Sequence, residues 1–293
     1  MAHKLVKFAL TELYNKPHLI TEQSILPILD YVDMRNLGEF HLQEDIDEDE
    51  YDEEMPRKLP HMIAGEIGVI KIHGSLTYRK QYTMCGAVGT SYQGLLESVD
   101  EFIEAGAKTI VLDVNSGGGE AYSCFSTADE MRRRVDEAGV KLVAMVDGMS
   151  CSAAYALACV ADEVIAHPNA SVGSIGCLIC LYNDSEALKK EGYERKFISF
   201  PKDKVPFAED GKFTDKFISR LEKDVKTLAV DFFDHVSKYT GLSTDGIEAL
   251  EAQVFNAKEA LEIGLVNKVM TQQEFSEYIK NNYLTITGIL NAG

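Results

Sequence analysis

Strand and helix patterns alternate along the chain from Gly65 onward, and this alternation constrains the fold more than any other feature of the sequence. Residues 69–72 (VIKI) and 109–114 (TIVLDV) have the short apolar pattern of buried strands. Between them, residues 92–105 repeat apolar side chains every three or four positions, as an amphipathic helix does. Repeated β-α-β units of this kind predict a mostly parallel sheet with helices on its faces. We therefore expect an α/β fold.

The later elements follow from the same patterns. The apolar stripe of Phe125, Ala128, Met131 and Val135 predicts a helix whose arginines at 132–134 face water. We also expect strands over 141–146, 164–166 and 175–181, a long amphipathic helix over 214–239 that Gly241 ends, and a last helix between Asn256 and Gly264.

An acidic run at residues 44–54 divides the chain. Its nine acidic residues, with no basic residue among them, supply half of the net charge of −18. Such a run is typical of a solvated linker, and the alternative is a docking segment for a basic partner. We expect four parts: an N-terminal helical appendage over 1–43 whose helix is capped by Thr21, an acidic linker over 44–64, the main domain over 65–275, and a C-terminal tail over 276–293.

Composition argues against several classes of protein. The negative charge disfavours binding of nucleic acid. The longest apolar run, residues 172–182, is too short for a membrane-spanning helix of about 20 residues, and the N-terminus lacks the apolar core of a secretion signal. The six cysteines form no paired framework, which predicts a reducing compartment such as the cytoplasm.

Metal sites are disfavoured as well. Cys177 and Cys180 form a CxxC pair, but they lie in an apolar run, where we expect buried strand cysteines. The seven histidines have no spacing that is typical of metal ligands. We expect neither a metal nor a cofactor.

Two segments that follow strands have the composition of a catalytic site. In VDGMSCSAAY, residues 146–155, Ser152 begins a run of small, helix-forming residues. A serine at a strand-to-helix turn presents its hydroxyl as a nucleophile, and we expect Ser150 to cap the helix. In NSGGG, residues 115–119, the glycines allow backbone N–H groups to approach an anion. Strand ends of this kind meet at the ligand site of a parallel sheet.

These motifs carry a resemblance to a known family. DVNSGGGEAY, SAAYALACVADEVIAHPNASVGSIG and VFNAKEALEIGLVNKV, in this order, resemble the signal-peptide-peptidase A family of serine peptidases over roughly residues 65–270. The resemblance implies a crotonase/Clp-like fold and a serine endopeptidase that forms an acyl-enzyme. It implies Ser152 as the nucleophile, and backbone N–H groups of Gly118 and Ala153 as the oxyanion hole. Gly117 and Ala153 depart from the family pattern, which has proline and glycine there.

The same resemblance implies a lysine as the general base. Lys204 lies where the family has this lysine, and Lys202 is the alternative because Pro201 replaces a glycine nearby. A Ser-Lys pair requires burial that lowers the lysine's pKa. His167 as the base of a Clp-type triad and Cys151 as the nucleophile are the less favoured assignments.

The resemblance finally implies a biological setting. The N-terminal LYNKPHLITEQSILPIL is similar to the entry segment of phage-encoded relatives, so we expect a prohead or capsid-maturation protease that cleaves scaffold and capsid proteins in the host cytoplasm or inside the prohead. Relatives form ring-like homo-oligomers with active sites at subunit interfaces. The alternatives are a soluble bacterial peptidase of the same mechanism, a crotonase-like acyl-CoA enzyme, and a catalytically silent assembly or scaffold-binding protein.

Overall fold

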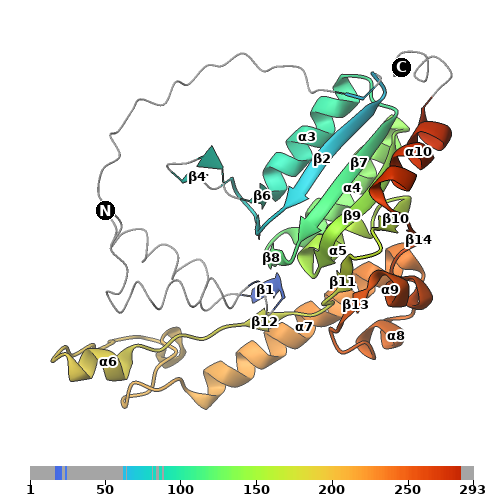
Figure 1. Cartoon of the computed structure of the whole chain (residues 1–293). Coiled ribbons are helices and arrows are strands. Elements are labelled where there is room, and N and C mark those ends of the chain that lie inside the picture. Colours follow the sequence, from blue (N-terminus) through green and yellow to red (C-terminus); the bar gives the residue numbers. More distant parts are fainter. Residues whose placement is uncertain are drawn as a thin grey trace, which may run out of the picture.

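The structure, a computed structural model, describes residues 17–21, 24, 62–63, 65–80, 82–83, 86–87 and 89–284 (Figure 1). Most of the expected N-terminal helix after Thr21 and the whole acidic run at 44–54 lie outside these residues. The division of the chain into four parts therefore stays a prediction.

A mostly parallel sheet forms the centre of the molecule, as expected. Its central strand, β9 (Lys141–Cys151), continues past the expected end at residue 146 into the segment of the candidate site. β9 pairs in parallel with β7 (Thr109–Ser116) and β10 (Glu163–Ala166), and β2 (Ile67–His73) and β14 (Lys268–Val269) extend the sheet in parallel on the two sides. The end of β9 pairs instead with β11 (Ser171–Gly173), whose other neighbour, β13 (Val254–Asn256), is antiparallel.

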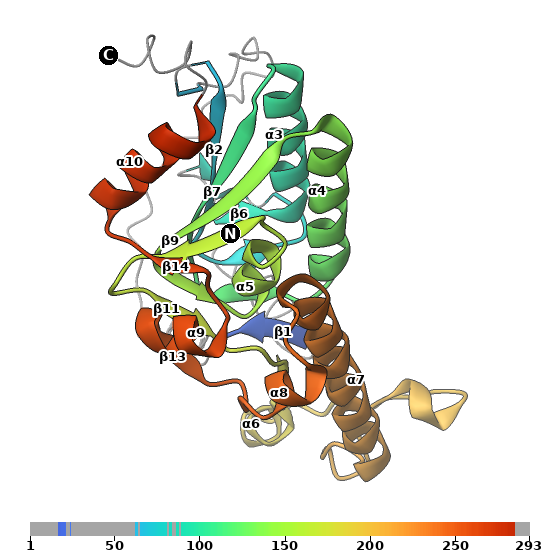
Figure 2. The ribbon, with the colours of Figure 1, turned by 90° about the vertical axis from the view of Figure 1, so that its right-hand side faces the viewer.

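Helices cover both faces of this sheet (Figure 2). α3 (Tyr92–Glu104) and α4 (Cys124–Ala138) lie on one face, and α10 (Gln272–Tyr283) lies on the other. Successive residues of a strand point to opposite faces. In β7, Ile110 and Leu112 therefore enter the main core, whereas Val111 packs in the smaller cluster with Ile279 of α10. The molecule is a layered α/β fold.

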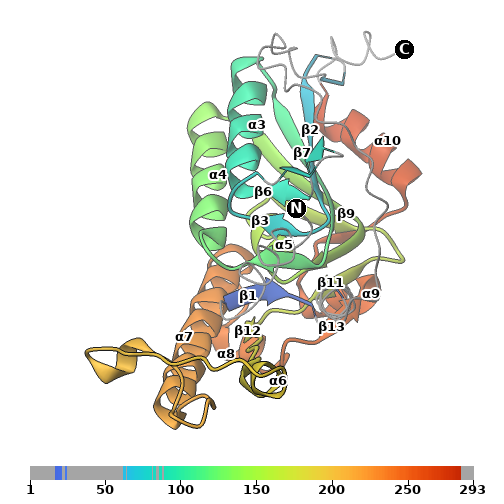
Figure 3. The same ribbon diagram turned by 90° about the vertical axis from the view of Figure 1, so that its left-hand side faces the viewer.

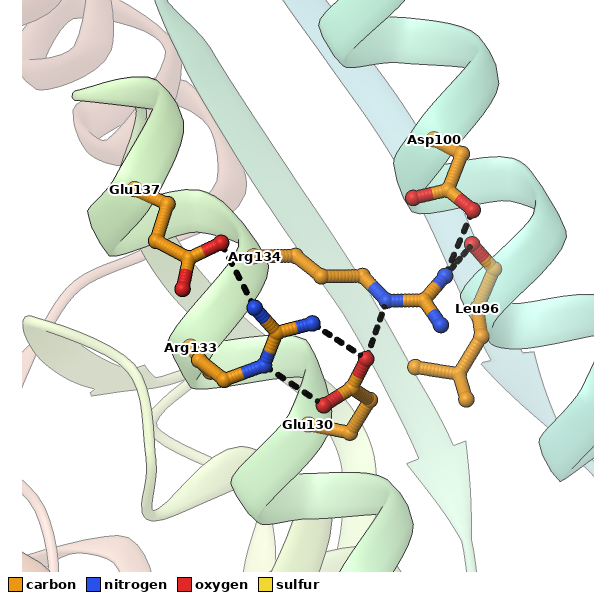
Figure 4. A network of polar contacts seen from close by, with 6 residues as sticks. All are labelled: Leu96, Asp100, Glu130, Arg133, Arg134 and Glu137. Carbon is orange, nitrogen blue, oxygen red and sulfur yellow. Dashed lines mark hydrogen bonds and ion pairs between the residues drawn. The ribbon is translucent and has the colours of Figure 1, made fainter.

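The expectation that the arginines of α4 face water is wrong for Arg132 and Arg134, and Figure 4 shows the contacts of Arg134 together with those of Arg133. Arg134 reaches across to α3, where its Nη1 donates to Asp100 Oδ2 at 2.5 Å. Arg132 has a side chain that is only 14 % exposed. Arg133 remains at the surface and binds Glu130 together with Arg134, and these hydrogen bonds lower the pKa of Glu130 to about 2.

A second sheet of short strands has the order β12-β1-β8-β3-β6. β1 (Pro17–Ile20) is antiparallel to both of its neighbours, β8 (Gly118–Glu120) and β12 (Leu178–Ile179). β3 (Leu76–Thr77) and β6 (Thr90–Ser91) complete this sheet, and β4 (Tyr82–Thr83) and β5 (Gly86–Ala87) form a separate hairpin. The strand expected over 175–181 is thus reduced to the two residues of β12.

The expected long helix is α7 (Asp215–Thr240), which ends at Gly241 in the left-handed conformation. Phe232 and Val236 in its C-terminal half are buried in the core, but the apolar side chains of its first half are only partly buried. α8 (Thr244–Glu248) and α9 (Ala257–Ile263) follow, and α9 is the helix expected between Asn256 and Gly264. The expectation that it is the last helix is wrong, because α10 follows it.

An arm of residues 183–214 precedes α7. It contains α6 (Ser185–Lys190) and the single-turn helix η1 (Lys202–Lys204). Figures 1 and 2 show the yellow and orange arm extending away from the central sheet, and Figure 3 shows the same from the opposite side. The arm is therefore placed to reach beyond the body of its own chain.

The C-terminal helix α10 crosses the expected tail boundary at residue 276. Glu163 of β10 accepts hydrogen bonds from Tyr278 Oη of α10 at 2.7 Å and from Lys268 Nζ of β14 at 2.5 Å, so the middle of α10 is tied to the sheet. Within the part of the chain that the structure describes, no helix is both long enough and apolar enough to cross a membrane.

Candidate active site

Ser152 occupies the turn between β9 and α5 (Ala153–Ala158). Its backbone has φ 55° and ψ −121°, a conformation that residues with a side chain rarely adopt and that costs about 1–3 kcal/mol. The Ser152 N–H donates to Gly173 O of β11 at 2.8 Å, which helps to hold this conformation. A strained serine between a strand and a helix is the backbone geometry of an activated nucleophile.

Ser152 is fully buried, and its hydroxyl lies 3.5 Å from Gly176 O, a distance at the limit for a hydrogen bond. The side chain makes no capping bond to α5. Ser150 does not cap the helix either, so that expectation is wrong: it lies within β9, and its buried Oγ has no hydrogen-bond partner.

The glycine segment approaches Ser152 from β7 and β8. Gly118 has φ +102°, and a Cβ atom added there would lie 2.1 Å from Leu19 O and 3.1 Å from Ala153 N. The structure therefore brings Gly118 and the N–H after the nucleophile together, and only glycine fits between them. The Gly118 N–H itself donates to Ser116 Oγ at 3.1 Å, and Ser116 Oγ donates to Gly74 O at 2.6 Å.

The helix behind the nucleophile is fixed from two directions. All six residues of α5 are buried. Tyr155 Oη donates to Leu265 O at 2.8 Å, and His235 Nε2 of α7 contacts Ala156 O at 2.9 Å. Because a carbonyl oxygen only accepts, His235 is the donor. The position of the Ser152 turn is thus tied to α7 and to the C-terminal segment.

Lys204 and Lys202 lie on η1, in the arm, and both are exposed. Lys204 borders a hollow of about 550 Å³ whose other walls include Phe197, Phe200 and Phe207. Ser152 lies in the body of the chain, from which the arm extends away in all three views. Within a single chain, the structure does not bring either lysine to the nucleophile.

Comparison with known proteins decides the family. The model of peptidase family S49 matches residues 134–283, which is half of the chain. The chain belongs to peptidase family S49. The matched region contains Ser152, Ala153 and Lys204, but it begins after Gly118.

Two phage proteins are among the relatives of this S49 chain. The capsid assembly protease C of Escherichia phage lambda is 27 % identical over 226 residues, which cover 76 % of this chain and 51 % of the relative. The head-tail preconnector protein GP5 of Enterobacteria phage P21 is 25 % identical over 225 residues, which cover 75 % of this chain and 43 % of the relative. The chain spans about half the length of the curated relatives that it matches.

Among solved structures, this chain has a limited similarity to a mutant of the 1510-N membrane-bound stomatin-specific protease in complex with a substrate peptide. The match has a TM-score of 0.42 at 13 % identity and covers 72 % of this chain and 78 % of that chain.

Cys151 and His167, the less favoured nucleophile and base, do not have the surroundings of catalytic groups in this S49 chain. Cys151 is fully buried, and burial raises the pKa of its thiol to about 12, so the reactive thiolate is scarce at neutral pH. His167 forms a turn after β10, where its N–H donates to Val146 O at 2.8 Å and its Nδ1 accepts from the Asn169 N–H. Both residues therefore have structural roles.

The CxxC pair differs in part from its expected environment. Cys177 and Cys180 flank β12 and are partly buried, not fully buried. Burial raises the pKa of the Cys177 thiol to about 12. Among the described residues, no group of three histidine, cysteine or acidic side chains is placed to hold a metal ion.

Sequence reasoning missed three neighbours of the nucleophile. Gly173 O and Gly176 O contact Ser152, and β1 lies against Gly118. GSIG at residues 173–176 is part of the family motif, but the sequence alone does not predict that its carbonyl groups contact Ser152. The four residues of β1, PHLI, have no periodicity that would identify them as part of a site.

Proposed function

We propose that this S49 chain is a serine endopeptidase in which Ser152 is the nucleophile and Lys204 the general base. The observation that carries the proposal is the strained backbone of Ser152 at the end of β9, packed against Gly118, in a chain of a peptidase family. Strain of this kind persists only where the surrounding structure imposes it, and it gathers at active sites.

In the proposed reaction, Ser152 Oγ attacks the carbonyl carbon of the peptide bond while its proton passes to a neutral Lys204 Nζ. The N–H groups of Ala153 and Gly118 hold the oxyanion, which requires the Gly118 N–H to turn from Ser116 Oγ. The C–N bond then breaks, and the lysine gives its proton to the leaving amine. Water, deprotonated by the same lysine, hydrolyses the acyl-enzyme and restores Ser152.

A lysine acts as a base only where burial favours its neutral form, and the single chain leaves Lys204 exposed. We propose that a second copy of the chain covers the arm and brings its own Ser152 to this lysine. Ile198 and Phe200, each 94 % exposed, give the arm an apolar surface of the kind that a subunit interface buries. The active sites then lie at interfaces of a homo-oligomer.

For the biological role, we propose a capsid-maturation (prohead) protease whose substrates are scaffold and capsid proteins. The support is the similarity to the lambda capsid assembly protease, together with the phage head protein of P21.

The test is cleavage of an unfolded protein by the wild type, Ser152→Ala, Lys204→Ala and Lys202→Ala, with the products read as intact masses. We expect the first two substitutions to abolish cleavage in folded, assembled protein and Lys202→Ala to retain it. Loss of cleavage in Lys202→Ala alone would move the base to Lys202. If the wild type cleaves nothing, the alternative of a catalytically silent assembly protein is favoured. If the protein binds an acyl-CoA thioester, the alternative of a crotonase-like enzyme is favoured.

Mixing the two inactive variants tests the shared site. If Ser152 and Lys204 of different copies meet, a mixed oligomer of Ser152→Ala and Lys204→Ala contains some sites with both groups intact. We therefore expect activity to reappear after the variants are dissociated and reassembled together. A mixture that stays inactive, although mass spectrometry shows mixed oligomers, places both groups in one chain.

A further inference from the structure

β1 is inserted as a middle strand next to the candidate active site. It pairs antiparallel with β8 on one side, through His18 with Glu120 and Ile20 with Gly118, and with β12 on the other, where Pro17 lies opposite Ile179. If β1 were absent, β8 and β12 would present two open strand edges separated by the width of one strand. We call this space the slot.

Both edges of the slot belong to the surroundings of the nucleophile. On the β8 side, Gly118 fits between Leu19 O and Ala153 N, so β1, the glycine segment and the N–H after Ser152 meet at one point. On the β12 side, Gly176, whose carbonyl contacts Ser152 Oγ, leads directly into that strand. A backbone in the slot therefore runs past the nucleophile.

β1 is held there by contacts along its whole length. His18, Leu19 and Ile20 are at most 6 % exposed, and Leu19 is completely buried in the main core. The Thr21 N–H extends the pairing by donating to Gly117 O at 3.0 Å. Thr21 Oγ1 donates to Ser24 Oγ at 2.7 Å.

Main-chain pairing does not depend on the identity of the inserted residues. A slot with two strand edges therefore accepts extended polypeptides in general, and its side-chain contacts select among them. An endopeptidase must hold its substrate extended with one carbonyl at the nucleophile. In this structure the chain's own residues 17–21 take the space that such a substrate needs.

We propose that residues 17–21 are a built-in competitive inhibitor, which occupies the substrate slot and is displaced by extended polypeptides with an apolar residue in the position of Leu19. The proposal rests on the proposed peptidase function. A hollow of about 540 Å³ continues from Pro17 along Tyr122, Phe125 and Leu228, and it receives the preceding part of the substrate. Substrate then binds only to the fraction of molecules in which the slot is open, so its apparent affinity falls in proportion to that fraction.

The first experiment weakens the inserted strand in the full-length chain. Thr21→Pro removes the N–H that donates to Gly117 O, and Leu19→Asp places a charge in the core position of β1. We expect kcat/KM for a peptide substrate to rise by at least about threefold in Thr21→Pro, through a lower KM at unchanged kcat. A fall in kcat together with a lower unfolding temperature in both variants would make β1 a structural strand and overturn the inhibitor.

The second experiment supplies the segment as a separate molecule. The synthetic peptide NKPHLITEQS, residues 15–24, is expected to restore the wild-type KM of the Thr21→Pro chain by competitive inhibition. The matched control is the same peptide with proline in place of threonine, which lacks only the one N–H and is expected to inhibit more weakly. Activation by the first peptide, or cleavage of residues 17–24 by the wild type, would contradict an inhibitory role.

Binding separates this proposal from the peptidase function. A fluorescent form of NKPHLITEQS is titrated onto the catalytically inactive Ser152→Ala, Thr21→Pro double variant and onto Ser152→Ala alone. We expect tighter binding to the double variant, because its slot is open more often. If the double variant binds the peptide more tightly but the wild type cleaves no substrate, the slot is supported and the proposed peptidase function is refuted. If both variants bind the peptide equally well, the slot is refuted, even in an active enzyme.

Discussion

Two residues at the centre of the site have a positive φ for different reasons. Ser152, at φ 55°, has a side chain and is held in place by the β9–β11 pairing and by the buried helix α5. Gly118, at φ +102°, has no side chain because Leu19 O and Ala153 N leave no room for one. The first has a strained backbone at a fully buried turn, and the second is small so that another backbone can approach.

Replacing Gly118 with alanine is therefore expected to remove activity. The added Cβ would lie 3.1 Å from both Ala153 N and Cys151 O, and 2.1 Å from the position of Leu19 O, which a substrate backbone in the slot would also occupy. The backbone conformation itself costs about 1–3 kcal/mol for alanine. We expect a lower unfolding temperature and complete loss of peptide cleavage. The matched control is Gly139→Ala after α4, where φ is +67° but no atom lies within 4 Å of the new Cβ; it should lose about 1 kcal/mol of stability and keep its activity. Equal activity of both variants would refute the close approach at Gly118.

Cys151 is expected to be inert although it precedes the nucleophile directly. Its pKa of about 12 leaves almost no thiolate at pH 8, and its side chain is fully buried. Iodoacetamide at pH 8 should therefore leave Cys151 of the folded chain unmodified, as read by peptide mass, and should modify it after denaturation. Rapid labelling of Cys151 in the folded chain, together with loss of activity, would instead support Cys151 as the nucleophile.

Among the elements, α7 connects the site to the arm. In its C-terminal half, His235 contacts α5 and Phe232 packs against Phe125 of α4, while its first half, next to the arm, has partly exposed apolar residues. His235 is buried, and burial is the main cause that lowers its pKa, against weaker opposing contributions from Ala156 O and Asp129. Burial at the contact between α7 and α5 therefore favours the neutral form of this histidine.

This histidine gives the fold a pH dependence. Because its pKa is lower in the folded than in the unfolded chain, the unfolded chain binds the proton first, and stability falls as pH drops below about 6.5. We expect urea midpoints of the wild type, at one protein concentration, to fall between pH 7.5 and 5.5, and to fall less in His235→Gln. The nearby Asp129 has a lowered pKa as well, and its contribution lies below this window. An equal fall in both proteins would rule out His235 as the cause.

The sequence patterns were sufficient for the long elements and insufficient for the short ones. The periodicity of α3, α4 and α7 and the apolar runs of β2, β7 and β9 identify them, because each buries a continuous stripe or face. β1, β8 and β12 have two to four residues each, and their pairing joins segments far apart in the chain. Nothing local to PHLI indicates that its partners are Gly118 and Leu178.

Part of the candidate site could likewise be predicted from the sequence, and part could not. Ser152 and Gly118 follow strands of one parallel sheet, so their approach follows from the topology, as does the proximity of Ala153. The position of Lys204 does not follow from the topology of the sheet. The arm that carries this lysine holds no strand of the central sheet, and the placement of the arm depends on α7. The roles of all four residues stay predictions until the variants are measured.

At the scale of the whole molecule, one chain keeps the proposed nucleophile Ser152 and the proposed base Lys204 apart, and its arm exposes apolar side chains. Such a chain is expected to be active only when assembled. The specific activity should fall as the protein is diluted below the concentration at which the oligomer dissociates, and an excess of Ser152→Ala should slow this fall by supplying intact arms. Size-exclusion chromatography with light scattering would give the assembly state at each concentration. Specific activity that stays constant in a monomer would refute the shared site.

The length of α7 also has a mechanical consequence. A helix of 26 residues is about 39 Å long, and only its C-terminal end is packed in the core. It therefore acts as a lever: a tilt of about 5° at Phe232 displaces Asp215, about 26 Å away along the helix, by about 2 Å. This is a large part of the hydrogen-bond reach of about 3 Å within which a nucleophile and its base exchange a proton. In the proposed pairing, small errors in how neighbouring copies pack would silence the enzyme, so that the accuracy of assembly itself becomes the switch for proteolysis.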